Sequence, residues 1–218
     1  STLKYRFNNM KKIFLLLVVV FSLNTVFAFE GVIEQRYTDI NTKSQQTFVW
    51  YISGDDVRLE IKNGEELIIV IPDFKSNTIS LFGDKADNDG KLWYSKVSIN
   101  QIDVGTPKMR LLEETKSIYN GKAAKDIKLM SADGMLAVQY LNEIDVNMKN
   151  MMTVFAESKE FGAIYLAGDQ GFPVSSMIMT ENEAINTLTT KSIEKKSLSS
   201  SMFEVPSNYA LFTPESIK

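Results

Sequence analysis

The chain has 218 residues, of which 44% are hydrophobic and 23% charged, and it contains neither histidine nor cysteine. This composition excludes Ser-His-Asp and Cys-His nucleophiles, histidine-based metalloprotease motifs, structural zinc and disulfides. The chemistry that remains belongs to carboxylates, lysine, tyrosine, serine, threonine and oxygen-bound cations. We expect no cofactor.

The N-terminal segment from Met10 to Ala28 has the pattern of a secretory signal peptide. Two lysines follow Met10, an apolar run extends from Ile13 to Phe21, and Ala28 ends the segment at a small-residue cleavage site. The run is shorter than the about 20 residues that a membrane-spanning helix needs, so an uncleaved anchor is the weaker alternative. Because Phe29 and not cysteine follows the cleavage site, no lipid anchor is expected.

Residues 1–9 are interpreted as an upstream extension, and residues 29–218 as one domain that is exported to the periplasm or the cell exterior. Residues 1–28 hold four basic and no acidic side chains, so 20 basic and 27 acidic residues remain after cleavage, a net charge of −7. This balance argues against nucleic-acid partners and against anionic lipid surfaces. The mature chain is not expected to be an integral membrane protein, and its core must stabilise it without disulfides.

Short alternating segments separated by turn residues dominate the chain after Phe29 and predict β-strands. The clearest alternation is at 57–62, and Asn63-Gly64 after it predicts a hairpin turn. Residues 98–114 show no clear pattern. The strands expected in chain order are 29–40, 46–53, 57–62, 67–71, 78–82, 91–97, 115–119, 124–130, 135–141, 163–167, 174–180 and 186–196, with a closing segment at 202–212.

Residues 145–161 are the exception, because their apolar residues recur at helical spacing and Asp145 can cap a helix. About ten strands with one or two helices predict a mainly β (α+β) domain. Its expected form is a strongly curved antiparallel sheet or half-open β-barrel with the helices against the concave side. A two-sheet sandwich is the main alternative.

Several stretches resemble an exported bacterial family labelled domain of unknown function four-four-one-two. They are FEGVI at 29–33, YISGDDVRLE at 51–60, GFPV at 171–174 and SLSSSMFEVPSNY at 197–209. Asn208 stands where that family more often has glycine. The family is similar to periplasmic lipoprotein carriers and lipoprotein-sorting proteins, so the resemblance implies a half-barrel around an apolar hollow and, by analogy, a lipid-like ligand. It implies no catalytic residue.

The acidic loop at 84–90 does not fit the EF-hand calcium pattern. With Gly90 at the sixth position, Lys85 and Lys96 occupy positions that need carboxylates. A solvated hairpin tip is favoured over weak cation binding, and no metal site is expected. Ser192 and Lys195 have the Ser-x-x-Lys spacing of some hydrolases, but residues three apart on a strand face opposite sides, so we interpret this match as chance.

Acidic neighbours occur at Glu113-Glu114 and at Glu143 with Asp145. A carboxylate hydrolase needs two such groups facing each other about 5 to 9 Å apart across a cleft. No sequence feature brings two of these carboxylates together, and a solvated surface is the preferred interpretation. No catalytic residue is predicted.

Eight apolar residues are the candidates to line a ligand-binding hollow, and an ordinary packed core is the competing interpretation. They are Phe48, Trp50, Trp93, Tyr94, Met148, Met151, Met152 and Phe155.

Three functions are compatible with the sequence. The first is a non-enzymatic exported protein that binds a lipid, another apolar small molecule or a lipidated partner in this hollow. The second is an envelope protein-protein interaction module with a solid core. The third is a carboxylate hydrolase, which requires two facing acids, one with a raised pKa.

Overall fold

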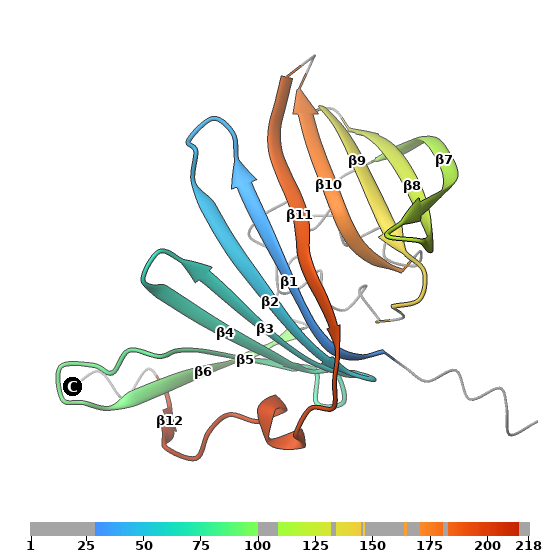
Figure 1. The fold of residues 1–218 in the computed structure, drawn as a ribbon. Coiled ribbons are helices and arrows are strands. Elements are labelled where there is room, and N and C mark those ends of the chain that lie inside the picture. The colour runs from blue at the N-terminus through green and yellow to red at the C-terminus, as the bar shows by residue number, and fades with distance from the viewer. Residues whose placement is uncertain are drawn as a thin grey trace, which may run out of the picture.

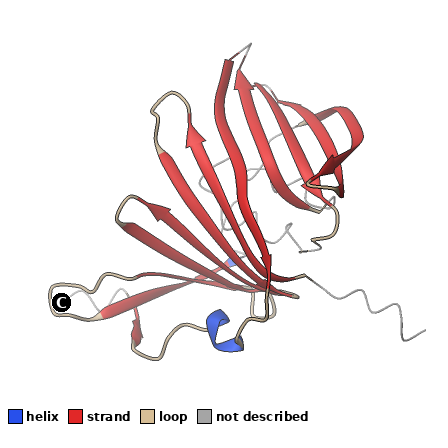
Figure 2. Cartoon of the chain, in the orientation of Figure 1, coloured by secondary structure: helices blue, strands red, loops and turns tan. Residues whose placement is uncertain are grey.

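The computed structural model describes residues 29–99, 109–131, 134–144, 146, 164, 171–180 and 183–213. Strands dominate this part of the chain (Figure 2), which confirms the mainly β prediction. The elements are β1 (Glu30–Asp39), β2 (Gln45–Ser53), β3 (Asp56–Asn63), β4 (Glu66–Asp73), β5 (Thr78–Gly83), β6 (Leu92–Ser98), β7 (Arg110–Tyr119), β8 (Lys122–Ser131), β9 (Gly134–Leu141), β10 (Phe172–Thr180), β11 (Glu183–Lys195), the 3₁₀ helix η4 (Ser200–Phe203) and β12 (Tyr209–Leu211).

All of these strands belong to one strongly curved sheet with the order β12-β6-β5-β4-β3-β2-β1-β11-β10-β9-β8-β7 (Figure 1). Neighbouring strands are antiparallel, except that β12 pairs with β6 in parallel. The sheet stays open and does not close into a barrel. Because every described strand lies in it, the structure decides for the curved sheet and against the two-sheet sandwich.

The strand order consists of two meanders that meet in the middle of the sheet. Strands β1 to β6 follow one another on one side, and β7 to β11 on the other. The join is the long antiparallel pair β1–β11, in which Ile33 lies opposite Ile193 and Tyr37 opposite Leu188. The first and the last long strands of the domain therefore hold its two halves together.

Alternation along the strands separates two faces, as the sequence pattern predicts. A row of directly opposite residues on one face consists of Ile33, Trp50, Leu59 and Val70, each at most 2% exposed. These side chains share one cluster with residues from β8 to β10, such as Val138. A single cluster can contain both halves because the sheet bends around it, so we call this side the concave face.

A second apolar cluster lies on the opposite, convex face and includes Ile69 and Phe82. Residues 196–213, which we call the C-terminal strap, cross this face. The ring of Tyr209 packs on Phe82 with centroids 4.9 Å apart, and its hydroxyl donates a 2.8 Å hydrogen bond to the carbonyl of Gly83. The strap thus covers apolar side chains that β4 and β5 would otherwise expose.

The structure differs from the expected elements in two places. Strand β7 begins at Arg110, inside the segment without a clear pattern. The hairpin loop after β3 consists of Gly64 and Glu65, with φ of 60° at Gly64, because Asn63 still pairs with Glu66. The helix expected at 145–161 and the strand expected at 163–167 lie outside the described residues, apart from isolated positions.

Candidate functional site

Two of the eight candidate lining residues, Phe48 and Trp50, are packed in the core. Only 1% of Phe48 and 0% of Trp50 is exposed. Trp50 packs against Phe172 in a T-shaped arrangement with ring centroids 5.6 Å apart, and Phe48 stacks on Tyr37 at 6.4 Å. For these two positions the structure favours the packed-core interpretation over an open hollow.

A buried glutamine connects this core to four strands. Gln35 is 0% exposed, and its Oε1 accepts a 2.9 Å hydrogen bond from Nε1 of Trp50. Its Nε2 donates to the carbonyl of Pro173 at 2.7 Å and to Oγ1 of Thr190 at 3.1 Å. Thr190 in turn donates to the carbonyl of Val174 at 2.7 Å. This network joins β1, β2, β10 and β11 inside the concave face.

Tyr94 lies on the other face of the sheet. It stands opposite Phe82, which is opposite Ile69, and these residues form the convex cluster under the C-terminal strap. Its side chain therefore points away from the face that holds Trp50. The pair Phe48 and Trp50 and the residue Tyr94 line no common space.

Trp93 lies at the start of β6, beside the acidic loop at 84–90. Its Nε1 donates a 2.6 Å hydrogen bond to Asp87, and its ring packs against Phe212 with centroids 6.2 Å apart. The ammonium of Lys91 lies 3.9 Å from the centre of the indole ring. Trp93 thus connects the loop at 84–90 and the C-terminal strap to the sheet.

The other four candidates, Met148, Met151, Met152 and Phe155, lie outside the described residues. The four described candidates lie in three different environments. Phe48 and Trp50 share the concave cluster, Tyr94 belongs to the convex cluster, and Trp93 packs beside the loop at 84–90. The single hollow proposed for all eight residues therefore stays a prediction for the methionine stripe only.

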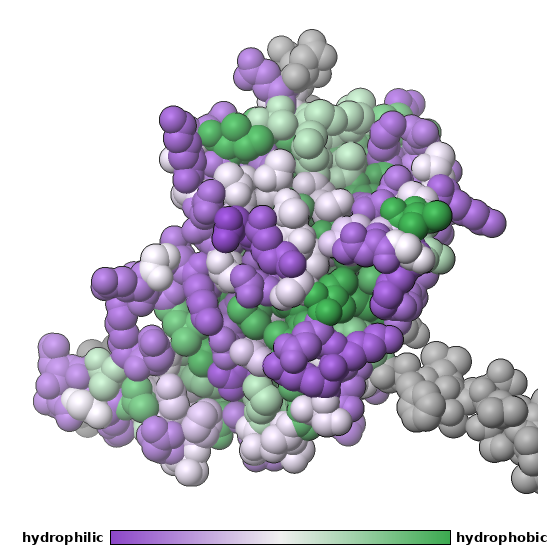
Figure 3. Space-filling view, in the orientation of Figure 1, coloured by the Kyte–Doolittle hydropathy of each residue, from purple (hydrophilic) through white to green (hydrophobic). Residues whose placement is uncertain are grey.

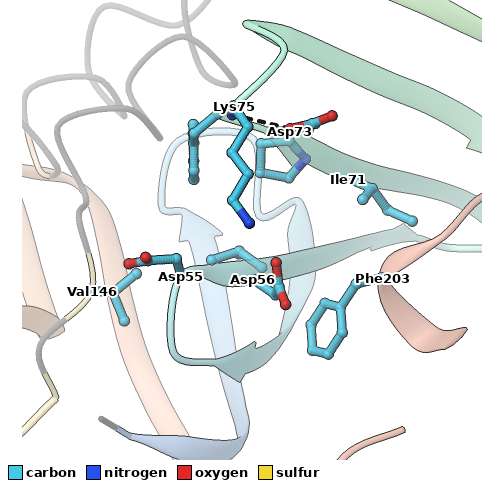
Figure 4. Close-up of a pocket in the computed structure, with 10 residues that line it drawn as sticks. Asp55, Asp56, Ile71, Asp73, Lys75, Val146 and Phe203 are labelled. Atoms are coloured by element: carbon cyan, nitrogen blue, oxygen red, sulfur yellow. Dashed lines mark hydrogen bonds between the residues drawn. The ribbon is translucent and has the colours of Figure 1, made fainter. Parts of the chain in front are cut away.

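A pocket of about 320 Å³ lies at the rim of the sheet, between the β2–β3 turn, the β4–β5 turn and the C-terminal strap (Figure 4). Its volume is at the lower end of the range for small-molecule sites. None of the four described candidates lines it. Its apolar residues are Val57, Ile71, Pro72, Phe74, Val146 and Phe203, and its polar residues are Asp55, Asp56, Asp73 and Lys75.

The polar side of this rim pocket is acidic. Figure 4 shows the side chain of Lys75 extending into the space toward Asp55 and Asp56. Asp73 accepts hydrogen bonds from the hydroxyl of Ser76 at 2.6 Å and from the backbone amides of Ser76 and Lys75 at 3.1 and 3.0 Å. These bonds, that of the Ser76 hydroxyl first, hold the pKa of Asp73 below its usual value of 3.8. Asp73 thus stabilises the β4–β5 turn as a hydrogen-bond acceptor.

Because the pKa of Asp73 is lower in the folded chain than in the unfolded chain, its contribution to stability is present above about pH 4 and is lost as the pH falls through the folded value. We expect Asp73→Asn to lower stability at pH 7 and to reduce the loss of stability on acidification. Denaturant unfolding at pH 7 and pH 3 measures both effects.

The loop at 84–90 is an exposed hairpin tip built around Asp87. The carboxylate of Asp87 accepts hydrogen bonds from Trp93 and from the backbone amides of Lys91 and Asp89. The bond from Trp93, followed by those from the amides, lowers the pKa of Asp87. Its oxygens are therefore used within the loop. Within the described ranges, no three acidic side chains gather in a way that could hold a metal ion.

The acidic pairs considered for hydrolysis are engaged in ion pairs. Glu113 pairs with Lys128 at 2.6 Å, and Glu114 pairs with Lys125 at 3.0 Å. As neighbours on β7, Glu113 and Glu114 face opposite sides of the sheet. Glu143 pairs with a lysine of β8, and its predicted companion Asp145 lies outside the described residues.

No family model and no curated protein matches this chain. Among solved structures, it is similar to PNGF-II, with 13% identity over 87% of this chain and 32% of that one and a TM-score of 0.49. It is also similar to MucB, with 14% identity over 85% of this chain and 62% of that one and a TM-score of 0.42. MucB in complex with MucA(peri) matches with 12% identity, 83% and 55% coverage and a TM-score of 0.42.

The chain spans about a third of the length of PNGF-II and less than two thirds of MucB. At these identities and TM-scores, no property of either protein transfers to this chain. The resemblance to domain of unknown function four-four-one-two stays a prediction, since no model of it matches. The described part of the chain contains no helix that is long and apolar enough to cross a membrane.

Proposed function

We propose that the protein acts after export as a non-enzymatic interaction module, whose interior is packed and whose surface binds another protein. The observation that carries this proposal is the contrast between a packed concave core and an open strand at the end of the sheet. Trp50 and its neighbours are buried in the concave cluster, whereas β7 exposes large apolar side chains. The signal-peptide pattern from Met10 to Ala28 supports a site of action outside the cytoplasm.

The exposed apolar residues lie toward the two ends of β7. Ile118 is 74% exposed, Leu111 54% and Leu112 42%, which makes this strand the most apolar exposed segment among the described ones. Figure 3 shows hydrophobic atoms at the surface at this end of the molecule, where Figure 1 places β7 and β8. An exposed edge strand that carries large apolar side chains is a template on which another chain can pair.

Photo-cross-linking in the producing cell tests the proposal. A photoreactive phenylalanine analogue at Ile118 should give a discrete cross-linked product that contains a second protein chain. Ile40, a 42% exposed isoleucine in the β1–β2 turn, is the matched control and should give none. No product at Ile118, or equal products at both positions, would overturn the interaction role.

The rim pocket favours a second candidate, the binding of an apolar or amphipathic small molecule. Its three carboxylates against one ammonium select a neutral or cationic head group over the carboxylate of a fatty acid. Native mass spectrometry of protein purified from its own host decides between the two candidates. A bound apolar molecule that is absent from the Phe203→Asp variant supports the ligand, and an unmodified chain mass excludes it.

A further inference from the structure

Strand β7 forms one end of the sheet, and among the described strands only β8 pairs with it. An edge strand of this length presents a row of backbone N–H and C=O groups that another strand can join. We infer that the partner of this edge is a second copy of the chain, and that two β7 strands pair antiparallel about a two-fold axis at Thr115. This inference rests on the proposed interaction role and names its partner.

The hairpin geometry determines which residues of β7 direct their backbone groups outward. Strands β7 and β8 are joined by the two-residue loop Asn120-Gly121, with positive φ at both positions. Tyr119 and Lys122 flank this loop and form a hydrogen-bonded pair. Because hydrogen-bonded and non-hydrogen-bonded pairs alternate, Thr115 also bonds inward to β8. The backbone groups of Glu114, Lys116 and Ile118 therefore point to the open edge.

Symmetry limits the possible registers, and charge favours Thr115 over its neighbours Glu114 and Lys116 as the centre of the pairing. A two-fold axis perpendicular to the sheet keeps each residue on its own face. In the regular part of β7, the axis therefore lies midway between the two copies of one residue. An axis at Glu114 places two glutamates opposite each other, and an axis at Lys116 places two lysines opposite each other. An axis at Thr115 places Glu114 of each copy opposite Lys116 of the other, and this pair can exchange both backbone hydrogen bonds.

The surroundings of Lys116 within the described chain favour a negatively charged partner. Lys116 stands directly opposite Lys125 on β8, an unfavourable pair of like charges. Lys125 is compensated by Glu114 at 3.0 Å, whereas Lys116 forms no ion pair within the described part of the chain. In the inferred dimer, Glu114 of the second copy supplies the missing negative charge.

The apolar residues of β7 fit the same register. The register of β7 against β8 shifts between Leu111 and Glu113, which marks a bulge at Leu112. With the axis at Thr115, Ile118 of one copy lies opposite this bulge of the other copy. The three most exposed apolar side chains of the strand would thus meet in pairs at the two ends of the joined edge. Exposed charges usually protect an edge from pairing, and here the register centred on Thr115 turns them into pairs of opposite charge.

Charge exchange tests the register. Sedimentation of the purified protein should show a dimer. Lys116→Glu and Glu114→Lys should each weaken it by about tenfold or more, because each turns both opposite pairs into like charges. Mixing the two variants should restore the dimer, since every opposite pair is then unlike. Lys85→Glu, on an exposed loop, is the control for net charge and should have no effect.

Cysteine cross-linking gives an independent readout, because the chain has no cysteine of its own. Residues on the axis in a non-hydrogen-bonded pair have Cα atoms about 4.5 Å apart, within disulfide range. Thr115→Cys should form a disulfide-linked dimer on oxidation. Ser117→Cys should not, because its two copies would lie about 13 Å apart.

A monomer that gives no Thr115→Cys dimer, or a dimer that is insensitive to both charge variants, overturns the inference. If cross-linking at Ile118 captures a different protein while the purified chain stays monomeric, the interaction role holds and the second-copy partner is wrong. If cross-linking at Ile118 captures nothing, both fail. The three results are distinguishable from one another.

Discussion

Replacing Trp50 with alanine is expected to lower the free energy of unfolding by about 3 to 5 kcal/mol. The side chain is 0% exposed and lies at the centre of the concave cluster, between Ile33 and Leu59 on the neighbouring strands and against the ring of Phe172. Its loss leaves a cavity that the strands around it cannot fill, because they are fixed by the sheet. Urea or guanidinium unfolding followed by circular dichroism measures the change.

Trp93→Ala is the matched control for this substitution. Trp93 is half-buried at the end of the sheet, so its removal should cost clearly less than the removal of Trp50. If both variants lose similar stability, the concave cluster is not the centre of the core. A ligand-lining role for Trp50 would instead predict weak destabilisation, with reduced binding of an apolar probe as the main effect.

Replacing Gln35 with leucine should cost about 2 to 4 kcal/mol, although leucine is apolar and of similar size. The substitution leaves the indole N–H of Trp50 and the carbonyl of Pro173 buried without the hydrogen bonds that Gln35 supplies. A buried polar group without a partner loses its hydration and gains nothing in return. Gln45→Leu, at the exposed start of β2, should change stability by less than about 0.5 kcal/mol.

A double-mutant cycle separates this hydrogen bond from packing. Trp50→Phe alone leaves Oε1 of Gln35 without its donor, and Gln35→Leu alone leaves Nε1 of Trp50 without its acceptor. The double variant removes both groups, so its cost should be smaller than the sum of the two single costs. Additive costs would contradict a direct coupling between the two side chains.

The strands that face the core on one side could be predicted from the sequence. Val57, Leu59 and Ile61 alternate with charged residues, and the structure has them on β3 with Leu59 in the core. Strand β7 could be recognised only in part, and the reason is physical. It lies at the edge with nearly all its residues exposed, so no buried face imposes alternation on residues such as Leu111 and Leu112.

The candidate site is less predictable than the strands, although the sequence holds one signal about it. Trp93 and Tyr94 are adjacent on a predicted strand, so their side chains must point to opposite faces and cannot line one hollow together. The role of Gln35 has no such signal. Its partners Pro173 and Thr190 lie more than a hundred positions away in sequence, and the rim pocket likewise depends on the distant residue Phe203.

The pairing of β1 with β11 has a kinetic consequence. Residue 31 must find residue 195, so the bond between the two halves forms only after almost the whole chain has been synthesised. Until then β1 keeps a free edge, although the hairpins that link β1 to β6 can already form. Such distant pairing slows folding, because a long loop must be ordered before its contacts stabilise the chain. A chaperone that shields the edge of β1 would therefore act during the interval in which the molecule is most prone to aggregate.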